Sequence, residues 1–260
     1  MNRNRTTSAS NNLLAVASLL GCALLAACSS TTEESAVEQG QKLFESKALS
    51  QSRLNDYTCA SCHDLVASTP PSKKTGGALS GVTLRTSFWG DQVADLLGAV
   101  NACRSNFMGD AKPLTAEDGQ ARSLYAYLES LEPGDSAPIP FRVVNTIDPL
   151  PRAETPEAIA DAHSHGELLY AQACLYCHGS MHDGAGRLST RLPILPEQTI
   201  AEHAQYSQRV QRLIFTEKIR HGLFLGYGGN MPPFSTELLS DTDVSDLLEA
   251  LGVLGIDDAQ

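Results

Sequence analysis

The sequence has few aromatic residues, no run rich in Lys and Arg, and no apolar stretch long enough to cross a lipid bilayer. Of its 260 residues, 6% are aromatic, 19 are Lys or Arg and 30 are Asp or Glu, which gives a formal net charge of −11. An acidic chain without a basic run argues against nucleic acid or an anionic membrane surface as a partner. The 42% of hydrophobic residues is too high for a disordered chain and fits one large or two small globular domains.

The N-terminal segment is typical of an export signal. Two arginines precede an uncharged apolar stretch at residues 13–27, which is shorter than a membrane span. The stretch ends in Leu25-Ala26-Ala27-Cys28, which resembles the bacterial lipobox, in which the Cys is acylated and begins the mature protein. We therefore predict a lipoprotein signal peptide at residues 1–27, a tether at residues 28–34 and a lipid anchor on Cys28. The alternative is an ordinary cleavage site with an incidental Cys.

The predicted location of the mature protein is the periplasm, where the lipid would be its contact with a membrane. Ser29 directly after Cys28 resembles the case in which a lipoprotein is sorted to the outer membrane. This favours the inner leaflet of the outer membrane.

Two cysteine motifs give the strongest indication of function. The chain has seven cysteines, and four of them form two Cys-x-x-Cys pairs that are each followed at once by His. This is the c-type haem attachment motif, in which two thiols on one helical turn meet the two vinyl groups of a haem and the His lies under the iron. The predicted attachment residues are Cys59, Cys62, Cys174 and Cys177, with His63 and His178 as proximal iron ligands, and the predicted cofactors are two covalently bound haem c groups.

Three other interpretations of these motifs compete with haem attachment: disulfide bonds, a zinc site and a redox-active dithiol. Exported proteins seldom use zinc knuckles of the cytosolic kind. A thioredoxin-like dithiol is expected in a βαβ pattern, which neither motif has.

Each motif lies in a module of the same order: an entry helix, the motif, a loop with a Met, and a closing helix. In both entry helices an aromatic residue follows a Gly at the same spacing: Phe44 follows Gly40 in the first module, and Tyr170 follows Gly166 in the second. Apolar residues at helical spacing predict the helices. These are residues 35–50 and 115–131 in the first module, and residues 162–173 and a helix opened by the capping box Ser240-x-x-Asp243 in the second.

This order resembles the class I cytochrome c fold, in which N- and C-terminal helices cross and a small helical core wraps the haem. The resemblance implies an all-α fold with two tandem cytochrome c domains, at residues 35–132 and 160–257. The segment between them, residues 133–159, is dense in Pro and predicts a linker. The chain is thus expected to be a dihaem c-type cytochrome.

The predicted distal ligand of the second haem is Met231. The Gly- and Pro-rich run around it is similar to the Met loop of small cytochromes c, in which the thioether reaches the iron. The alternatives are His182, His203 and His221, and His/His ligation would leave the Met-Pro loop without a function.

For the sixth ligand of the first haem, the sequence leaves three alternatives: Met108, Cys103 or no ligand. A second histidine is not available, because His63 is the only histidine of the first module. The segment 101–114 resembles the corresponding loop of two families, the dihaem thiosulfate dehydrogenases and the haem subunit of the sulfur-oxidising multienzyme system. In them the Cys of an Asn-x-Cys pattern ligates the haem and takes part in sulfur chemistry. The resemblance implies such a catalytic role for Cys103, if the chain is an enzyme.

The chain departs from those two families around this Cys. They set further basic and hydroxyl residues there to hold the sulfur anion, whereas here only Arg104, Ser105 and the more distant Arg85 are available. Cys103 is otherwise interpreted as a small buried hydrophobic residue on the helix before the Met loop.

Three functions follow from these observations. The first is electron transfer between other redox proteins, such as a soluble cytochrome, an oxidase or a dehydrogenase. The second is a thiosulfate dehydrogenase-like oxidoreductase that acts on a small sulfur anion at Cys103. The third, a dihaem peroxidase, lacks a His-lined peroxide site in the first module.

Lys73 and Lys74 are the only basic pair near either motif, and they are either solvated or able to draw an anionic partner.

Overall fold

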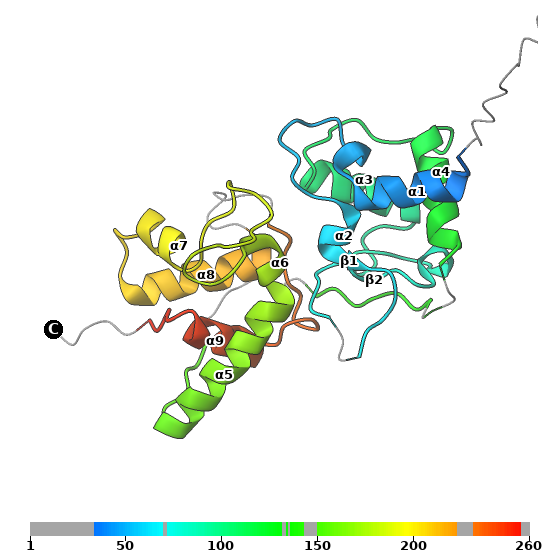
Figure 1. Cartoon of the computed structure of the whole chain (residues 1–260). Helices are drawn as coiled ribbons and strands as arrows, with labels where there is room; N and C mark the ends of the chain where they lie inside the picture. The colour runs from blue at the N-terminus through cyan, green and yellow to red at the C-terminus, as the bar shows by residue number, and fades with distance from the viewer. Residues whose placement is uncertain are drawn as a thin grey trace, which may run out of the picture. The chain divides into compact units, whose positions relative to one another are not determined.

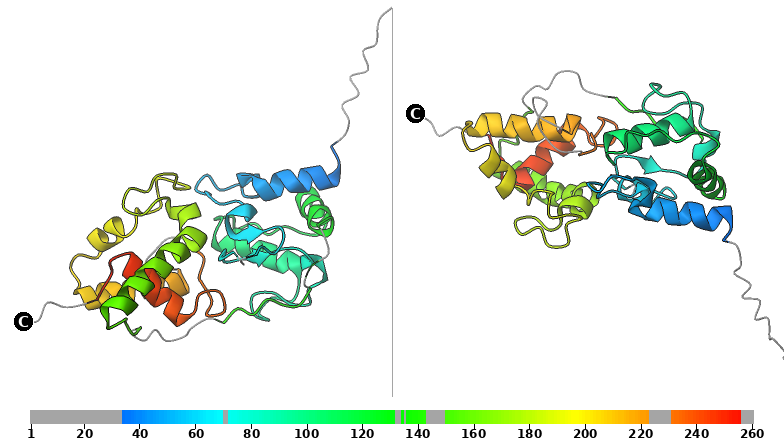
Figure 2. Two further views of the ribbon diagram at one scale, coloured as in Figure 1. Left: turned by 60° about the horizontal axis from the view of Figure 1, so that its bottom comes forward. Right: turned by 90° about the horizontal axis from the view of Figure 1, so that it is seen from above.

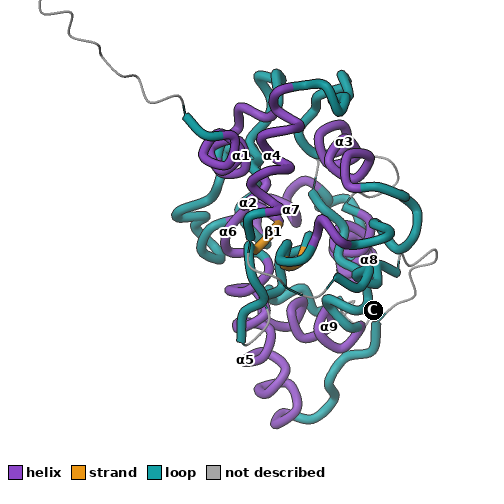
Figure 3. The backbone as a smooth tube through the Cα atoms, turned by 90° about the vertical axis from the view of Figure 1, so that its right-hand side faces the viewer, coloured by secondary structure: helices purple, strands orange, loops and turns teal. Residues whose placement is uncertain are grey.

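The computed structural model of the protein describes residues 34–69, 72–131, 134, 136–142, 150–222 and 231–255. In this part of the chain, helices joined by long loops dominate (Figure 1). Strand is limited there to His63–Asp64 (β1), which pairs in parallel with Gly77–Ala78 (β2); strands are drawn in orange in Figure 3. The prediction of a helical fold is confirmed at this level.

The helices fall into two sets, each with its own hydrophobic core cluster. We call the described residues 34–131 the first helix group and the described residues 150–255 the second. The first group contains α1 (Ala36–Glu45), the 3-10 helix η1 (Lys47–Leu49), α2 (Cys59–Cys62), the 3-10 helix η2 (Val82–Leu84), α3 (Leu96–Asn106) and α4 (Gly119–Glu129). The second contains α5 (Pro156–Ala173), α6 (Leu175–His178), α7 (Glu197–Glu202), α8 (Gln208–His221) and α9 (Asp241–Ala250).

Side-chain caps determine where several helices begin. The capping box predicted at Ser240 is present, since the Asp243 N–H donates to Ser240 Oγ at 3.1 Å and the Ser240 N–H donates to Asp243 Oδ2 at 2.9 Å. Ser35 and Glu38 form a second box at the start of α1. Each box satisfies backbone donors that the first helical turn leaves without partners.

Three predicted helix boundaries are shifted, for local reasons. The helix predicted at residues 35–50 ends at Glu45 and is followed by η1. The helix predicted at residues 115–131 begins only at Gly119, because Asp118 accepts from the Thr115 N–H at 2.7 Å and forms a turn before it. The helix predicted at residues 162–173 begins earlier, at Pro156, where Pro takes the first helical position.

A glycine lies where the entry and closing helices cross in each group, α1 with α4 and α5 with α9 (Figures 1 and 2). A Cβ on Gly40 would lie 2.0 Å from the Ser123 carbonyl oxygen of α4, and a Cβ on Gly166 would lie 2.1 Å from the Asp246 carbonyl oxygen of α9. The helix backbones are therefore in direct contact at both crossings. The aromatic partners named by the sequence, Phe44 and Tyr170, are each 2% exposed.

We expect Gly40→Ala and Gly166→Ala each to lower the free energy of unfolding by about 2 kcal/mol, because the added methyl group must push two helix backbones apart. The gain in helix propensity from Gly to Ala, about 1 kcal/mol, offsets only part of the cost. Guanidinium unfolding of the holoprotein, followed by circular dichroism, measures the change. The matched control is Gly119→Ala, since a Cβ there meets no atom within 4 Å. Equal stability of all three variants would contradict the close crossings.

Candidate functional site

The first attachment motif forms one helical turn. Cys59 and Cys62 are the first and last residues of α2, and residues three apart in a helix lie on one face. The turn begins at Thr58, whose N–H donates to Ser61 Oγ at 2.9 Å. Both thiols are thus presented on the same side, as attachment to one haem requires.

The imidazole of His63 packs on glycine backbone. His63 pairs with Gly77 in the short sheet, and the N–H of the neighbouring Gly76 donates to the Cys62 carbonyl at 2.8 Å. A Cβ on Gly76 would lie 2.2 Å from His63 Cε1, so a residue without a side chain is needed there. Burial lowers the pKa of His63 to about 4, so the ring is neutral at pH 7 and has a lone pair for a metal.

One cavity in the first helix group brings together the residues predicted for the first haem site. It is lined by Cys59, Cys62 and His63, by Cys103 of α3, and by Met108, which follows α3. Most of the other lining side chains are apolar. Burial raises the pKa of the Cys103 thiol to about 12, so that thiol is uncharged at pH 7.

These residues fit a covalently held haem. Two thiols on one turn match its two vinyl groups, and the neutral imidazole beside them supplies a proximal nitrogen. Cys103 and Met108 each bring a sulfur to the same cavity, so the two predicted candidates for the sixth ligand remain in competition. A haem held there would supply a one-electron iron couple in apolar surroundings.

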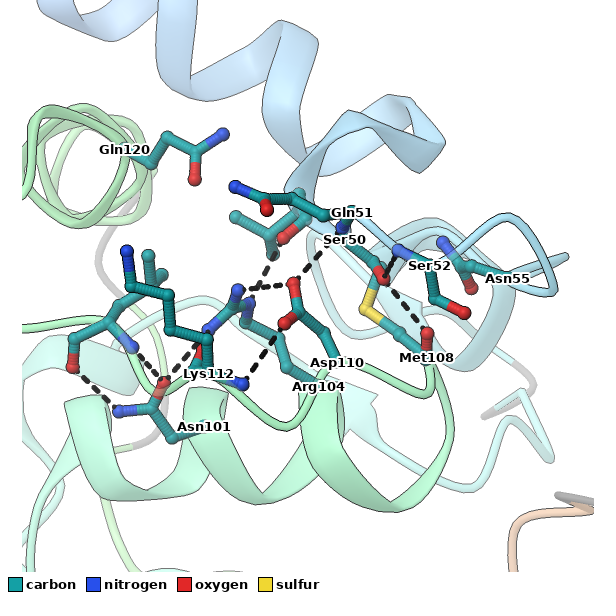
Figure 4. A network of polar contacts seen from close by, with 12 residues as sticks. Ser50, Gln51, Ser52, Asn55, Asn101, Arg104, Met108, Asp110, Lys112 and Gln120 are labelled. Carbon is teal, nitrogen blue, oxygen red and sulfur yellow. Dashed lines mark hydrogen bonds and ion pairs between the residues drawn. The ribbon is translucent and has the colours of Figure 1, made fainter.

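The loop that carries Met108 is fixed by a buried polar network (Figure 4). The Met108 carbonyl accepts from Ser50 Oγ at 2.9 Å. The Asp110 carboxylate accepts from the Gln51 N–H at 3.0 Å and from Arg104 Nη2 at 2.6 Å. The loop after α3 is thus bonded to the segment after η1, and the Met108 side chain is held in the core at 4% exposure.

Arg104, which the sequence placed beside Cys103 as a possible contact for a sulfur anion, is bound within this network instead. Its Nε donates to the Leu49 carbonyl at 3.0 Å, and its Nη1 donates to the Lys112 carbonyl at 2.7 Å. Asp110 balances its charge, and the Arg104 side chain is 4% exposed. Arg104 lines the cavity, but Asp110 balances its charge and backbone carbonyls accept from its other donors, so it stabilises the Met108 loop.

The two other candidate contacts for an anion also have partners in the protein. Ser105 Oγ donates to the Ala102 carbonyl of its own helix at 3.2 Å. Arg85 Nη2 donates to the Ala78 carbonyl at 2.8 Å and to the Ser80 carbonyl at 3.3 Å, while the residue lines the cavity. Of these two, Arg85 is the residue that places a positive charge at the cavity wall.

The second attachment motif is likewise a single turn. Cys174 precedes α6, which ends at the buried His178. His178 Nδ1 donates to the Pro193 carbonyl at 3.0 Å, because a carbonyl only accepts, and this leaves the lone pair on Nε2 for iron. Burial lowers the pKa of His178, which favours the neutral ring.

Met231 packs against the core cluster of the second helix group, the cluster that contains Cys174. Gly222 ends α8 with a φ of +74°, and a Cβ there would lie 2.0 Å from the Met231 carbonyl oxygen. The chain thus needs glycine to bring Met231 back to α8. The intervening residues 223–230 of the predicted Met loop lie outside the described residues.

The histidines considered as alternatives to Met231 have other neighbours. His182 Nδ1 lies 2.6 Å from Glu197 Oε1, and His221 Nδ1 lies 2.6 Å from Glu217 Oε2. His203 lies beside the ring of Tyr206. The side chain of His182 is 62% exposed, which is typical of a surface histidine.

The described residues contain neither of the bonding patterns that the disulfide and zinc interpretations of the motifs require. None of the five cysteines in the described residues is bonded to another cysteine, and those residues hold no group of three or more His, Cys, Asp or Glu side chains arranged for a metal ion. Neither a disulfide nor a zinc ligand set is therefore present there.

The predicted signal peptide and Cys28 lie outside the described residues, as do residues 133, 135 and 143–149 of the predicted linker. No helix in the described part has the length and apolarity to cross a membrane.

Lys74 is a site residue whose place the sequence did not predict. Its ammonium donates to the Ala60 carbonyl at 3.0 Å and the His63 carbonyl at 3.3 Å, and it lies 3.0 Å from Asp64 Oδ1. A cation is favoured at these carbonyls because they end a helical turn. No spacing rule joins a loop lysine to a motif that precedes it, so no signal in the sequence reveals the contact.

These features fit a c-type cytochrome: each helix group carries a Cys-x-x-Cys-His turn and is closed by crossing helices. Residues 161–249 match the family model described as cytochrome C oxidase, cbb3-type, subunit III. The match runs from α5 into α9, so the second helix group is a cytochrome c domain, which implies covalently bound haem c and electron transfer. The searches of curated proteins and of solved structures gave no match.

Proposed function

We propose that the protein is a lipid-anchored, periplasmic dihaem c-type cytochrome that transfers electrons between redox partners. Its two tandem cytochrome c domains are residues 35–132 and 160–257, and each holds one haem c. The partners are other redox proteins, such as a soluble cytochrome, an oxidase or a dehydrogenase. Its contact with the membrane is the lipid on Cys28, in the inner leaflet of the outer membrane.

The observation that carries this proposal is the repeat of one architecture in both helix groups. In each group a Gly-containing entry helix crosses the closing helix, and a Cys-x-x-Cys-His turn lies between the two in sequence. The family match covers the second group alone. The repeat supports a second haem in the first group, where the cavity is lined by both motif cysteines, by His63 and by two further sulfur-bearing side chains.

The residues of each site have distinct tasks in electron transfer. The paired cysteines hold the haem, and His63 and His178 ligate the iron as neutral imidazoles. A Met as sixth ligand raises the potential and fills the open position, which favours electron transfer over substrate chemistry. Pro193 orients His178 and the Gly76 backbone positions His63, so the two proximal ligands are fixed by different means.

A redox titration of the holoprotein with optical detection tests this function. We expect two haems per chain by the pyridine haemochrome assay, and reduction that resolves into two one-electron components of unequal potential. The potentials differ because the two sites have different surroundings and independent sixth ligands. One haem per chain would contradict the dihaem proposal, even with intact electron transfer at the second site.

A second candidate function is supported by the position of Cys103, which lines the same cavity as His63. A thiolate ligand there would favour the thiosulfate dehydrogenase-like reaction on a small sulfur anion. The commitment of Arg104 to Asp110 and to loop carbonyls removes one of the charges that such an anion would need. In this alternative, Cys103→Ala abolishes thiosulfate-dependent haem reduction, and retained reduction excludes Cys103 from the mechanism.

A further inference from the structure

One lysine side chain contacts both attachment motifs. The described residues from Glu34 onward belong to one compact unit of the chain. Within it, the Lys74 ammonium donates to the carbonyls of Ala60 and His63 in and after α2, and it lies 5.5 Å from the ring centre of Tyr176. Tyr176 is the third residue of the second motif. Lys74 therefore bridges the two turns that carry the attachment cysteines.

The surroundings of Lys74 favour this bridge. Asp64 Oδ1 lies 3.0 Å from the ammonium, and the Lys74 side chain is 26% exposed. The ammonium thus has two carbonyls, one carboxylate and one aromatic ring around it, and partial burial strengthens its attraction to the ring. The sequence predicts that Lys74 is either solvated or able to attract an anion, whereas in the structure its ammonium contacts groups of the protein.

An ion pair joins the same two segments at another point. Arg191 follows the second motif, and its Nε and Nη2 donate to Asp56 Oδ2 at 2.9 Å and 2.5 Å. The same Nη2 donates to the Leu54 carbonyl at 2.9 Å. Asp56 lies three residues before Cys59, so the pair fixes the approach to the first attachment turn.

Apolar contacts also join the two helix groups. Cys177 and Leu188 of the second helix group pack against the core cluster of the first group. Pro232 and Pro233, which follow the predicted ligand Met231, line the cavity of the first site.

We propose that Lys74 and the Arg191–Asp56 pair are positioning residues that hold the second attachment turn against the first, so that the two haem sites keep a fixed separation. The inference rests on the proposed dihaem function. A fixed separation allows one electron to leave the iron of one site and reduce the iron of the other within the chain. No bond forms or breaks in this exchange, and no proton is required.

The two polar contacts differ in their sensitivity to salt. The Arg191 side chain is 48% exposed, so salt screens its attraction to Asp56. Lys74 is more buried and keeps its carbonyl partners, which makes its contact less sensitive. The separation of the two sites is therefore expected to remain fixed at moderate salt, when the Arg191 contact alone has weakened.

The test uses the holoprotein and the variants Arg191→Gln, Lys74→Gln and the double variant. Hydrogen exchange of residues 54–57 reports on the contact without any need for haem. Pulsed electron paramagnetic resonance between the two ferric irons reports on their separation. The matched controls are Arg53→Gln and Lys112→Gln, which remove exposed charges of the same kind from the first helix group.

We expect exchange at residues 54–57 to be several-fold faster in Arg191→Gln and roughly tenfold faster in the double variant, as the loss of two partly exposed charge contacts predicts. The distribution of iron–iron distances should broaden in the same order, with two haems retained and the controls unchanged. Unchanged exchange and unchanged distances in the double variant would overturn the proposal. If Lys74→Gln impairs haem attachment, Arg191→Gln alone decides the outcome.

A haem count on the wild-type protein separates this inference from the proposed function. One haem per chain would defeat the proposed function, whereas two haems with freely varying separation would defeat the positioning role alone.

Discussion

Replacement of both Cys174 and Cys177 by Ala is expected to reduce the covalently bound haem from two per chain to one. The two thiols are the proposed attachment points of the second motif, and Cys174 belongs to the core cluster of the second helix group. Loss of the haem would also remove the apolar centre around which that group packs, so its helices should unfold separately at lower denaturant. The pyridine haemochrome assay and haem-peptide mapping measure the first effect, and circular dichroism measures the second.

The reciprocal variant, Cys59→Ala with Cys62→Ala, should leave one haem on the second motif. The control is Cys103→Ala, which removes a thiol from the first cavity without touching either motif, and its haem count should stay at two. Two haems in both double variants would show that the motifs are not the attachment sites. A complete loss of haem from either double variant would show that the two groups cannot mature independently.

Met108→Ala is expected to change the ligation of the first haem, and Cys103→Ala is expected to leave it intact. Met108 lies in the first cavity on a loop that Ser50 and the Arg104–Asp110 pair hold in place. Loss of a thioether ligand should lower the potential of the first haem by on the order of a hundred millivolts, since axial ligands tune haem potentials over about 0.8 V. Low-temperature electron paramagnetic resonance and optical redox titration of each variant measure the change.

The matched control is Met181→Ala, which removes a partly buried methionine from the second helix group. Its first haem should be unaffected. A thiolate signature in the wild type that is lost in Cys103→Ala, but not in Met108→Ala, would reverse the assignment. That result would favour the sulfur-oxidising function and make thiosulfate the first substrate to test.

The sequence predicted the parts of the sites that are local in the chain. The two Cys-x-x-Cys-His turns form as expected, because residues three apart share a face of one helical turn. The capping box at Ser240 and the pairs Gly40 with Phe44 and Gly166 with Tyr170 were predictable for the same reason. Each is a pattern of spacing within a single helix.

The contacts that the sequence did not predict join residues far apart. The sequence predicts Arg104 only as a possible contact for an anion beside Cys103. Its buried ion pair and its carbonyl contacts depend on how the loop after α3 folds back onto the segment after η1. The contacts of Lys74 and Arg191 could not be predicted for the same reason, since their partners belong to segments far away in the sequence. The choice between Cys103 and Met108 also remains, because both sulfurs reach one cavity.

The His63 ring packs directly on the Gly76 backbone, and Lys74 lies two residues before Gly76, so one short loop contacts the proximal ring and carries this lysine. The same lysine touches Tyr176 of the second motif. If both proposed haems are bound, any free-energy coupling between the two sites through this loop would be reciprocal, so each site would change the potential of the other by the same amount.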